Sequence, residues 1–201
     1  MDRSGEKPEP TVESGWKEEE MKRTKLRSII LAGILAALSF ALMRFTEFPL
    51  IPAAPFLKTD LGDIPLLVGA VYLGPWYGVA IAFIKNLLFL ASGGGSGGLL
   101  GSTVNFIALG SFAIVLGSIV KRTINLKRLL LGFTAGTVVM ALIMIPVNFW
   151  AVPLFLPGIT HPALISYLFK VNLPFNLIKG ALDTIITIVT LTAIKKRNLS
   201  I

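Results

Sequence analysis

Four polar residues near the end of the chain have the types and spacing of a binding site: Asn172, Asn176, Lys179 and Asp183. Successive members are four, three and four residues apart, which places all of them on one face of a helix. Asparagine offers two donors and one acceptor, and lysine offers three donors. These groups suit a planar heterocycle with carbonyl and imide edges. A lysine in an apolar segment also needs a partner, so Asn176 and Lys179 are predicted to bind a ligand.

A second group of charges, Lys58, Asp60 and Asp63, interrupts a stretch that is otherwise apolar. The prolines before it fix the backbone and predict an extended, ordered loop; they are Pro49, Pro52 and Pro55. Asp63 is predicted to be the N-cap of the next helix, with Pro65 in its first turn. The two carboxylates and Lys58 could instead hold a metal or a phosphate. No histidine or third acidic residue lies near them in the sequence, which disfavours that chemistry.

The composition indicates the environment of these groups. The 201 residues are 54% hydrophobic and only 15% charged, whereas soluble domains carry about 25% charged residues. The chain is therefore predicted to be an integral membrane protein. It has no cysteine and a single histidine, which excludes a disulfide framework and a Cys- or His-rich metal site. In such a protein the net charge of +8 is better explained by an asymmetry between loops than by a nucleic-acid partner.

Six apolar segments are predicted to be membrane helices, although two are short for a span of about 20 residues. They cover residues 28–45, 62–73, 77–91, 99–120, 129–150 and 174–194, with a short helix in 162–170. The predicted organisation is a charged tail without regular structure, 1–24, and a membrane domain, 25–201. The predicted fold class is an all-α integral membrane protein with a bundle of six transmembrane helices.

Lysine and arginine residues predict the topology. Fourteen of the 19 lie in the tail, in the loop 121–128 or at 195–197, so these segments and both termini are predicted to be cytoplasmic. The loop 58–65, the glycine tract 93–98 and the segment 151–172 are then outside. Asn148 and Asn176 lie ~30 and ~28 Å from the cytoplasmic ends of their helices, at 1.5 Å per residue. The sequence therefore predicts a pocket open to the outside, with the loop 58–65 as its lid.

Other polar residues have structural explanations. Lys85 and Asp183 are both predicted near mid-membrane, where they would form an internal ion pair. The glycine tract lacks the Gly-Lys-Ser/Thr ending of a phosphate loop and predicts a flexible hairpin. Aromatic side chains at the outer level fit either an interfacial belt or stacking on a ring, and the sequence leaves both open.

Small residues on the first helix recur at intervals of four and include Ala32, Gly33, Ala36 and Ala37. Such faces let helices approach closely. The pattern alone fits packing inside the bundle as well as docking of a partner.

The loop motif Leu57-Lys58-x-Asp60-x-x-Asp63-Ile64-Pro65, followed by Asn176-x-x-Lys179, resembles the riboflavin-specific S components of energy-coupling factor (ECF) transporters. The resemblance covers about residues 25–197. It implies the six-helix S-component bundle, with riboflavin held near the outer face by the first outer loop and helices four to six. Three residues match flavin hydrogen-bonding positions: Asn148, Asn176 and Lys179. With the lid and its neighbours, the predicted substrate-binding residues are Phe56, Leu57, Lys58, Asp60, Asn148, Asn172, Asn176 and Lys179.

The resemblance also implies partners. A transmembrane T component would dock on the alanine motif of the first helix, and two cytoplasmic ATPases would complete the complex. The predicted docking residues are Ala32, Gly33, Ala36 and Ala37, and the predicted structural residues are Asp63, Pro65, Lys85 and Asp183. The chain itself would be a transport subunit of the bacterial cytoplasmic membrane, with no enzymatic activity, cofactor, metal or nucleic acid. Gly62 departs from a serine that is common in the family.

Three alternatives remain compatible with the residues. The chain could be an S component for another vitamin, such as pantothenate or thiamin, which the absence of bound flavin colour would reveal. It could be an intramembrane enzyme acting on lipid through Lys58, Asp60 and Asp63, which would require metal-dependent turnover. It could also be a structural subunit without a ligand, but the face that carries Asn176 and Lys179 argues against this.

Overall fold

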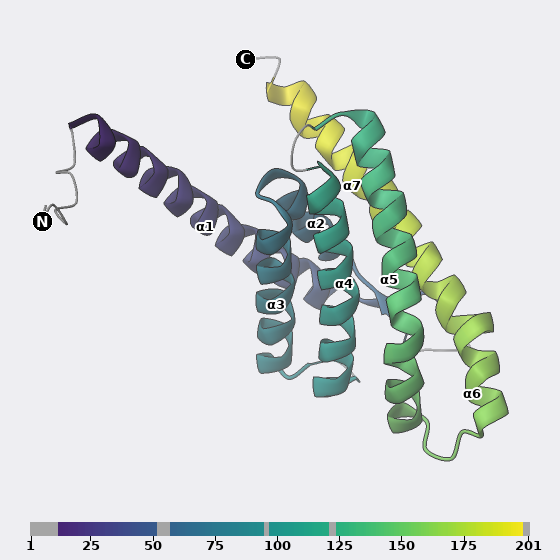
Figure 1. The fold of residues 1–201 in the computed structure, drawn as a ribbon. Coiled ribbons are helices and arrows are strands. Elements are labelled where there is room, and N and C mark those ends of the chain that lie inside the picture. The colour runs from purple at the N-terminus through teal and green to yellow at the C-terminus, as the bar shows by residue number, and fades with distance from the viewer. Residues whose placement is uncertain (1–11, 52–56, 95–96, 121–123, 199–201) are drawn as a thin grey trace, which may run out of the picture.

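The computed structural model describes residues 12–51, 57–94, 97–120 and 124–198, and nearly all of them lie in helices (Figure 1). The elements in chain order are α1 (Val12–Thr46), β1 (Phe48–Pro49), β2 (Lys58–Thr59), α2 (Asp63–Tyr72), α3 (Pro75–Ala91), α4 (Gly98–Val120), α5 (Leu126–Phe155), α6 (His161–Tyr167), the π-helix η1 (Leu168–Asn172) and α7 (Leu173–Asn198). The two short strands pair antiparallel, Phe48 with Thr59 and Pro49 with Lys58. The predicted all-α architecture is confirmed.

The short helix α2 lies at the centre of the bundle. Every residue from Asp63 to Val71 is buried, because α2 contacts α1, α3, α4 and α7. A helix that is apolar on all sides is stable only when it is covered all round. Its ten residues span about 15 Å, which explains why this segment is short for a membrane span.

The outer helices have the length and surface of membrane spans. Four helical stretches are long and apolar enough to cross a bilayer, Glu20–Thr46, Gly98–Val120, Leu126–Phe155 and His161–Lys196, while α2 and α3 are shorter apolar helices. Large apolar side chains point outward from the bundle, including Ile34, Leu142 and Val189. This surface is suited to lipid rather than water, so the protein is embedded in a membrane.

Glycine and proline build the turn between α2 and α3. Gly74 has φ of +106°, a conformation that side chains disfavour, and Pro75 starts α3. Helix α4 crosses this turn at Gly117, where a Cβ atom would lie 2.7 Å from the backbone nitrogen of Pro75. The glycine on α4 lets the turn and α4 touch.

The chain before the last helix differs from the prediction. Residues 151–172 are predicted to form a long outer segment that contains a short helix in 162–170. The short helix is confirmed as α6, which begins at His161, but α5 continues to Phe155 and shortens the loop. Helices α6, η1 and α7 then follow without a break. The last predicted segment begins at Pro174, which lacks an N–H and disfavours the interior of a helix. The π-turn η1 absorbs this defect, since the N–H of Leu173 reaches back five residues to the carbonyl oxygen of Leu168.

The small residues of α1 face two directions. Ala32 and Ala36 are buried in the core of the chain, 6% and 0% exposed, where α1 packs on α2 and α3. The prediction that these two alanines present a docking surface therefore needs correcting, because their own bundle covers them. Gly33 and Ala37 are exposed, and their docking role stays a prediction.

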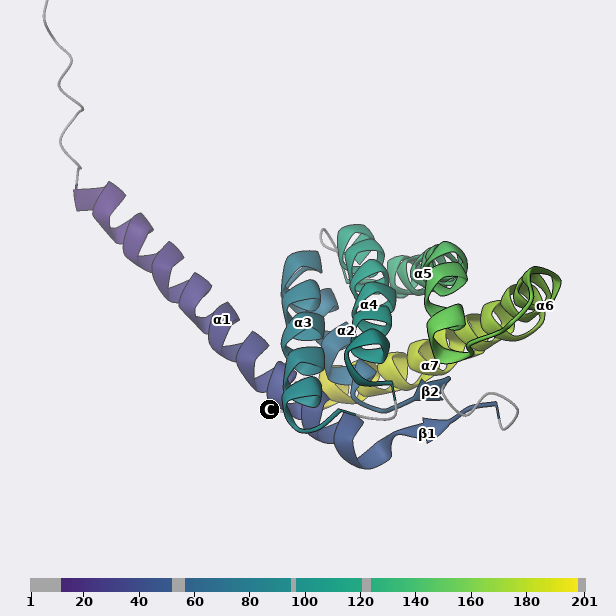
Figure 2. The same cartoon turned by 90° about the horizontal axis from the view of Figure 1, so that it is seen from below.

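Helix α1 already begins at Val12, inside the charged segment 1–24, and runs away from the bundle (Figure 2). The predicted domain boundary between 1–24 and 25–201 stays a prediction.

Candidate functional site

A cavity lies between the β1–β2 hairpin and helices α4, α5 and α7. Its empty space, counted together with the open solvent at its mouth, is about 830 Å³. The predicted substrate-binding residues that line it are Leu57, Lys58, Asp60, Asn148, Asn172, Asn176 and Lys179. The remaining predicted residue, Phe56, lies outside the described residues. The structure thus brings these residues together, and their contact with a ligand stays a prediction.

Three asparagines form one wall of the cavity, and we call Asn148, Asn172 and Asn176 the amide array. Asn148 and Asn172 both donate to the carbonyl oxygen of Met144, at 3.0 and 3.2 Å. The Nδ2 of Asn176 donates to the backbone oxygen and the Oδ1 of Asn172, at 2.8 and 3.0 Å. These bonds fix the side chains and use both N–H groups of Asn176. The Oδ1 of Asn176 therefore remains as an acceptor, and Asn148 retains one N–H and its oxygen.

Lys179 lies on the same face of α7, one turn beyond Asn176. Its Nζ donates to the Oδ2 of Asp63, lies 3.4 Å from the Oγ1 of Thr59 and is 3.9 Å from the Oδ2 of Asp183. The expectation that Lys179 needs a ligand as its charge partner is therefore wrong, since Asp63 already neutralises it. With three N–H groups, Lys179 can still donate one hydrogen bond into the cavity that it lines.

Behind the cavity lies a group of buried charges, and we call Asp60, Asp63, Lys85, Lys179 and Asp183 the ion cluster. The Nζ of Lys85 is 2.8 Å from Asp60 and 2.5 Å from Asp63, and Lys85 is completely buried. The predicted pair of Lys85 with Asp183 is wrong, because the partners of Lys85 come from the loop before α2 and from the start of α2. Since unpaired charges are costly in an apolar interior, each member of the cluster constrains its neighbours.

Asp63 has a different role from the predicted N-cap. Gly62 occupies the N-cap position without a side-chain hydrogen bond, and Asp63 is the first residue of α2. Its two carboxylate oxygens bond Lys85 and Lys179 respectively. Asp63 therefore joins α2 to α3 and α7, which agrees with a structural role but through ion pairs rather than helix capping.

Asp60 links the ion cluster to the loop that leads from the hairpin. Its Oδ1 accepts from Lys85 and from the N–H of Gly62, both at 2.8 Å. Burial raises the pKa of Asp60 and the nearby Asp63 carboxylate raises it further, while Lys85 opposes both effects. A side chain on Gly62 would collide with the backbone oxygen of Ser39 on α1 and come within 2.7 Å of the Asp60 carboxylate. Glycine at this position therefore permits the close approach of the loop to α1.

The β1–β2 hairpin borders the cavity on the side of the predicted lid. Lys58 on β2 pairs with Glu47 at 3.0 Å, and both side chains are partly exposed. The N–H of Leu61 donates to the Oγ1 of Thr46 at 2.9 Å. These contacts hold the hairpin to the end of α1, next to the cavity.

Several cavity residues were not predicted from the sequence. Glu47 lies at the hairpin, and α4 contributes Ser102 and Asn105 together with a glycine face. The glycine tract was expected to be only a flexible hairpin, yet Gly97 and Gly98 line the cavity. The missed signal is the spacing of 98, 101, 102, 105 and 108, which places small and polar residues on one face of α4.

The alternative of a metal-dependent enzyme finds no support in this geometry. Asp60 and Asp63 direct their oxygens at lysines. Within the part of the chain that the structure describes, no three His, Cys, Asp or Glu residues form a group that could hold a metal ion. The acidic residues instead build the interior that positions Lys179.

A membrane-embedded helical bundle with a polar, partly enclosed cavity defines a membrane protein that binds a small molecule. A family model described as "ECF transporter, substrate-specific component" matches residues 27–191. The chain belongs to this family of ECF transport components. The predicted resemblance is thereby confirmed, and the family is one of transport subunits rather than enzymes.

Named relatives and a solved structure agree with the family. The chain is 34% identical over 169 residues to the riboflavin transporter RibU of Streptococcus thermophilus, covering 81% of this chain and 80% of that protein. It is 30% identical to the riboflavin transporter FmnP of Bacillus subtilis, covering 81% of this chain and 88% of that protein. A solved S component of a bacterial ECF transporter matches with a TM-score of 0.71 and 29% identity, over 86% of this chain and 97% of that one.

Proposed function

We propose that this chain captures riboflavin as the substrate-binding subunit of an ECF importer. The observation that carries the proposal is the set of free hydrogen-bonding groups on the α5–α7 wall. Asn176 offers an acceptor, while Asn148 and Lys179 each offer a donor. The pyrimidine edge of a flavin presents the complementary set, one N–H and two carbonyl oxygens. The names of the relatives support the same ligand.

The remainder of the cavity suits the apolar part of a flavin ring. Phe89, Phe155 and Phe175 line it together with Met43 and Met144. Aromatic and thioether side chains contact a flat ring favourably and exclude water. Polar recognition at one edge and apolar contact over the ring is the usual division of labour in small-molecule sites.

A spectrum of the purified chain tests the ligand. We expect a visible flavin band in the purified protein or after riboflavin is added, and quenching of flavin fluorescence on titration. Pantothenate and thiamin serve as controls and are expected not to displace the flavin. If riboflavin leaves the spectrum and the fluorescence unchanged while another vitamin binds, the ligand assignment is wrong.

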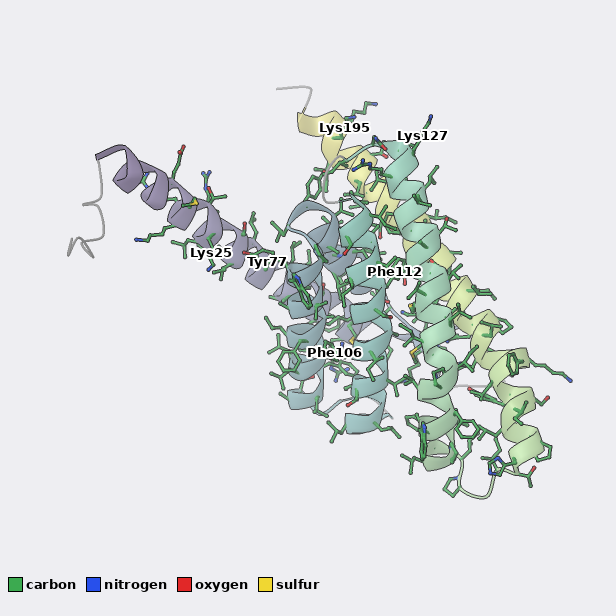
Figure 3. The ribbon with its side chains drawn as sticks, viewed as in Figure 1. Lys25, Tyr77, Phe106, Phe112, Lys127 and Lys195 are labelled. Carbon is green, nitrogen blue, oxygen red and sulfur yellow. The ribbon has the colours of Figure 1, made fainter. Side chains whose placement is uncertain are left out.

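The topology is part of the same proposal: six spans in the bacterial cytoplasmic membrane, with both termini cytoplasmic. Lys127 and Lys195 lie at the end of the bundle where α5 begins and α7 ends (Figure 3), which the positive-inside rule favours as cytoplasmic. Helix α4 begins at the opposite end, and its first residues line the cavity (Figure 1). This arrangement supports a cavity that opens to the outside.

Transport would require a transmembrane T component and two cytoplasmic ATPases, since the proposed role of this subunit is ligand capture. The exposed small residues Gly33 and Ala37 give α1 a face that another helix can approach closely. Ala37→Trp is therefore expected to abolish co-purification with the T component and the ATPases and to leave riboflavin binding intact. The matched control is Val138→Trp on the exposed face of α5. Full co-purification of the Ala37→Trp variant would place the docking surface elsewhere.

A further inference from the structure

The first turns of α1 extend beyond the apolar run that crosses the membrane. Helix α1 has 35 residues and is therefore about 52 Å long, whereas the hydrocarbon core of a bilayer is about 30 Å thick. The apolar run begins at Ile29, and the part of α1 before it runs away from the bundle (Figure 2). This part of α1 therefore reaches the lipid headgroups and the water beside them.

A groove separates this part of α1 from the start of α3, and we call it the α1–α3 groove. It is lined by Glu20, Met21, Thr24, Lys25 and Ser28 of α1 and by Tyr77 of α3. Lys25 and Tyr77, both labelled in Figure 3, come from its two sides. Tyr72 and Trp76 at the neighbouring α2–α3 turn are 48% and 75% exposed. Exposed tyrosine and tryptophan at the end of a membrane helix mark the headgroup level, so the groove opens where lipid headgroups lie.

The groove has a positive charge and free acceptors. Lysine or arginine occupies positions 22, 23, 25 and 27 of α1, and Lys25 is exposed. Glu20 also lines the groove, but it precedes Lys25 by five residues and so lies ~7.5 Å further from the apolar run. The hydroxyls of Thr24 and Ser28 donate to backbone oxygens one turn earlier, at 2.9 and 3.1 Å. Their oxygens remain as acceptors, while Lys25 and the hydroxyl of Tyr77 are donors.

We infer that the α1–α3 groove binds the headgroup of an acidic phospholipid, with Lys25 and Tyr77 donating to its phosphate. Its acyl chains then lie against the exposed apolar side chains of α1 that begin at Ile29. Basic residues at the end of a membrane helix attract acidic lipids, and a zwitterionic lipid has no net charge to offer them. Under the proposed topology this lipid belongs to the cytoplasmic leaflet. The inference does not depend on riboflavin.

Two lipids that differ only in the headgroup test the inference. The full-length chain in detergent is titrated with phosphatidylglycerol or with phosphatidylcholine, and native mass spectrometry measures how much lipid each protein molecule retains. Phosphatidylglycerol is expected to bind more tightly. Lys25→Gln is expected to weaken its binding roughly fivefold and to leave phosphatidylcholine binding unchanged, and Tyr77→Phe is expected to act in the same direction. The matched control, Lys127→Gln, removes an exposed charge at the start of α5 and is expected to bind both lipids as the parent does.

Equal affinity of the unsubstituted protein for the two lipids would overturn the inference. Unchanged phosphatidylglycerol binding in Lys25→Gln and Tyr77→Phe, or an equal loss in Lys127→Gln, would place the lipid outside the groove. Displacement of the lipid by an equal concentration of glycerol phosphate would show a site for soluble phosphates instead.

Lys25→Arg separates charge from folding. This variant keeps the positive charge and is expected to retain phosphatidylglycerol binding, so a loss as large as that of Lys25→Gln would show that Lys25 acts through the fold. Riboflavin titration of the same samples reports on the proposed function alone, because a chain that fails to bind riboflavin can still prefer the acidic lipid.

Discussion

The ion cluster and the amide array are both polar, both buried and adjacent along α7, yet they differ in how their hydrogen-bonding capacity is used. In the ion cluster, Asp63 directs each oxygen at a lysine, and Lys85 contacts two carboxylates. In the amide array, the internal bonds fix the side chains but leave the oxygen of Asn176 and one N–H of Asn148. Lys179 belongs to the first group and lines the cavity with the second.

The difference separates structural from functional polarity. A buried group whose partners all belong to the protein fixes the positions of helices, and losing one partner leaves an unpaired charge. A buried group with remaining capacity, facing a cavity, gains its last partner only when a ligand arrives. The following substitutions test whether changes in the ion cluster lower the stability of the protein and changes in the amide array lower its affinity for the ligand.

Lys85→Met is expected to have the largest effect, on stability. Removing one partner of a buried ion pair costs about 3–5 kcal/mol, because Asp60 loses its lysine and Asp63 keeps only Lys179. The measurement is the thermal unfolding of the purified protein in detergent. The double variant Lys85→Met/Asp60→Asn removes the opposing charge as well and should recover part of the loss. A melting temperature equal to that of the parent would contradict the structural role of the ion cluster.

Asn176→Ala is expected to act on affinity instead. The loss of one ligand hydrogen bond, with a buried ligand N–H left unsatisfied, lowers riboflavin affinity roughly tenfold to a hundredfold. Its effect on the melting temperature should be smaller than that of Lys85→Met. Leu177→Ala, on the exposed side of α7, is the control. A lower melting temperature with unchanged riboflavin affinity in Asn176→Ala would contradict the assignment of stability to the ion cluster and affinity to the amide array.

Gly62→Ser introduces a side chain beside the ion cluster. Its Cβ would meet the backbone of Ser39 and the carboxylate of Asp60, so we expect a loss of about 1–3 kcal/mol from overpacking. Gly33→Ser is the control, because a Cβ at Gly33 meets nothing within 4 Å. Equal melting temperatures for the two variants would mean that the loop moves away from α1 without cost.

Lys58→Met is expected to have the smallest effect. Lys58 forms an ion pair with Glu47 as Lys85 does with Asp60, but both side chains are more than one-fifth exposed. Partly exposed pairs contribute about 0–1 kcal/mol to stability. Thermal unfolding of Lys58→Met beside Lys85→Met measures how far burial, rather than charge pairing itself, determines the cost. A drop as large as that of Lys85→Met would remove this distinction.

Much of the fold could be predicted because hydropathy and spacing are local properties. The helix ends at Val120 and Ala91 agree with the predicted segments, and the rise per residue placed Asn148 and Asn176 at one level. The partner of Lys85 could not be predicted in this way, since height along a helix says nothing about direction around it. Lys85 and Asp183 are predicted at one level, but the acceptors that reach Lys85 are Asp60 in the loop before α2 and Asp63 at the start of α2.

Two other errors have a similar origin. Both Ala32/Ala36 and Gly33/Ala37 are four residues apart, so the spacing cannot tell which pair faces the core. Pro174 has a strong local tendency to end a helix, but packing of Leu164 and Leu168 against Val152 on α5 stabilises a continuous helix with one π-turn. Ser102 and Asn105 were missed because a serine or asparagine within a predicted membrane helix fits an ordinary contact between helices until α4 is known to face a cavity.

The order in which the charges of the ion cluster are synthesised has a consequence for membrane insertion. Asp63 and Lys85 are 22 residues apart and lie on successive helices, so the α2–α3 hairpin carries opposite charges together. Lys179 follows Asp63 by 116 residues, a delay of roughly 6 to 23 seconds at ordinary elongation rates. When it arrives, Asp183 accompanies it one turn away on the same helix. The α2–α3 hairpin and α7 therefore each carry an opposite pair of charges to the translocation machinery. Neither element must wait for the other to lower the cost of its insertion.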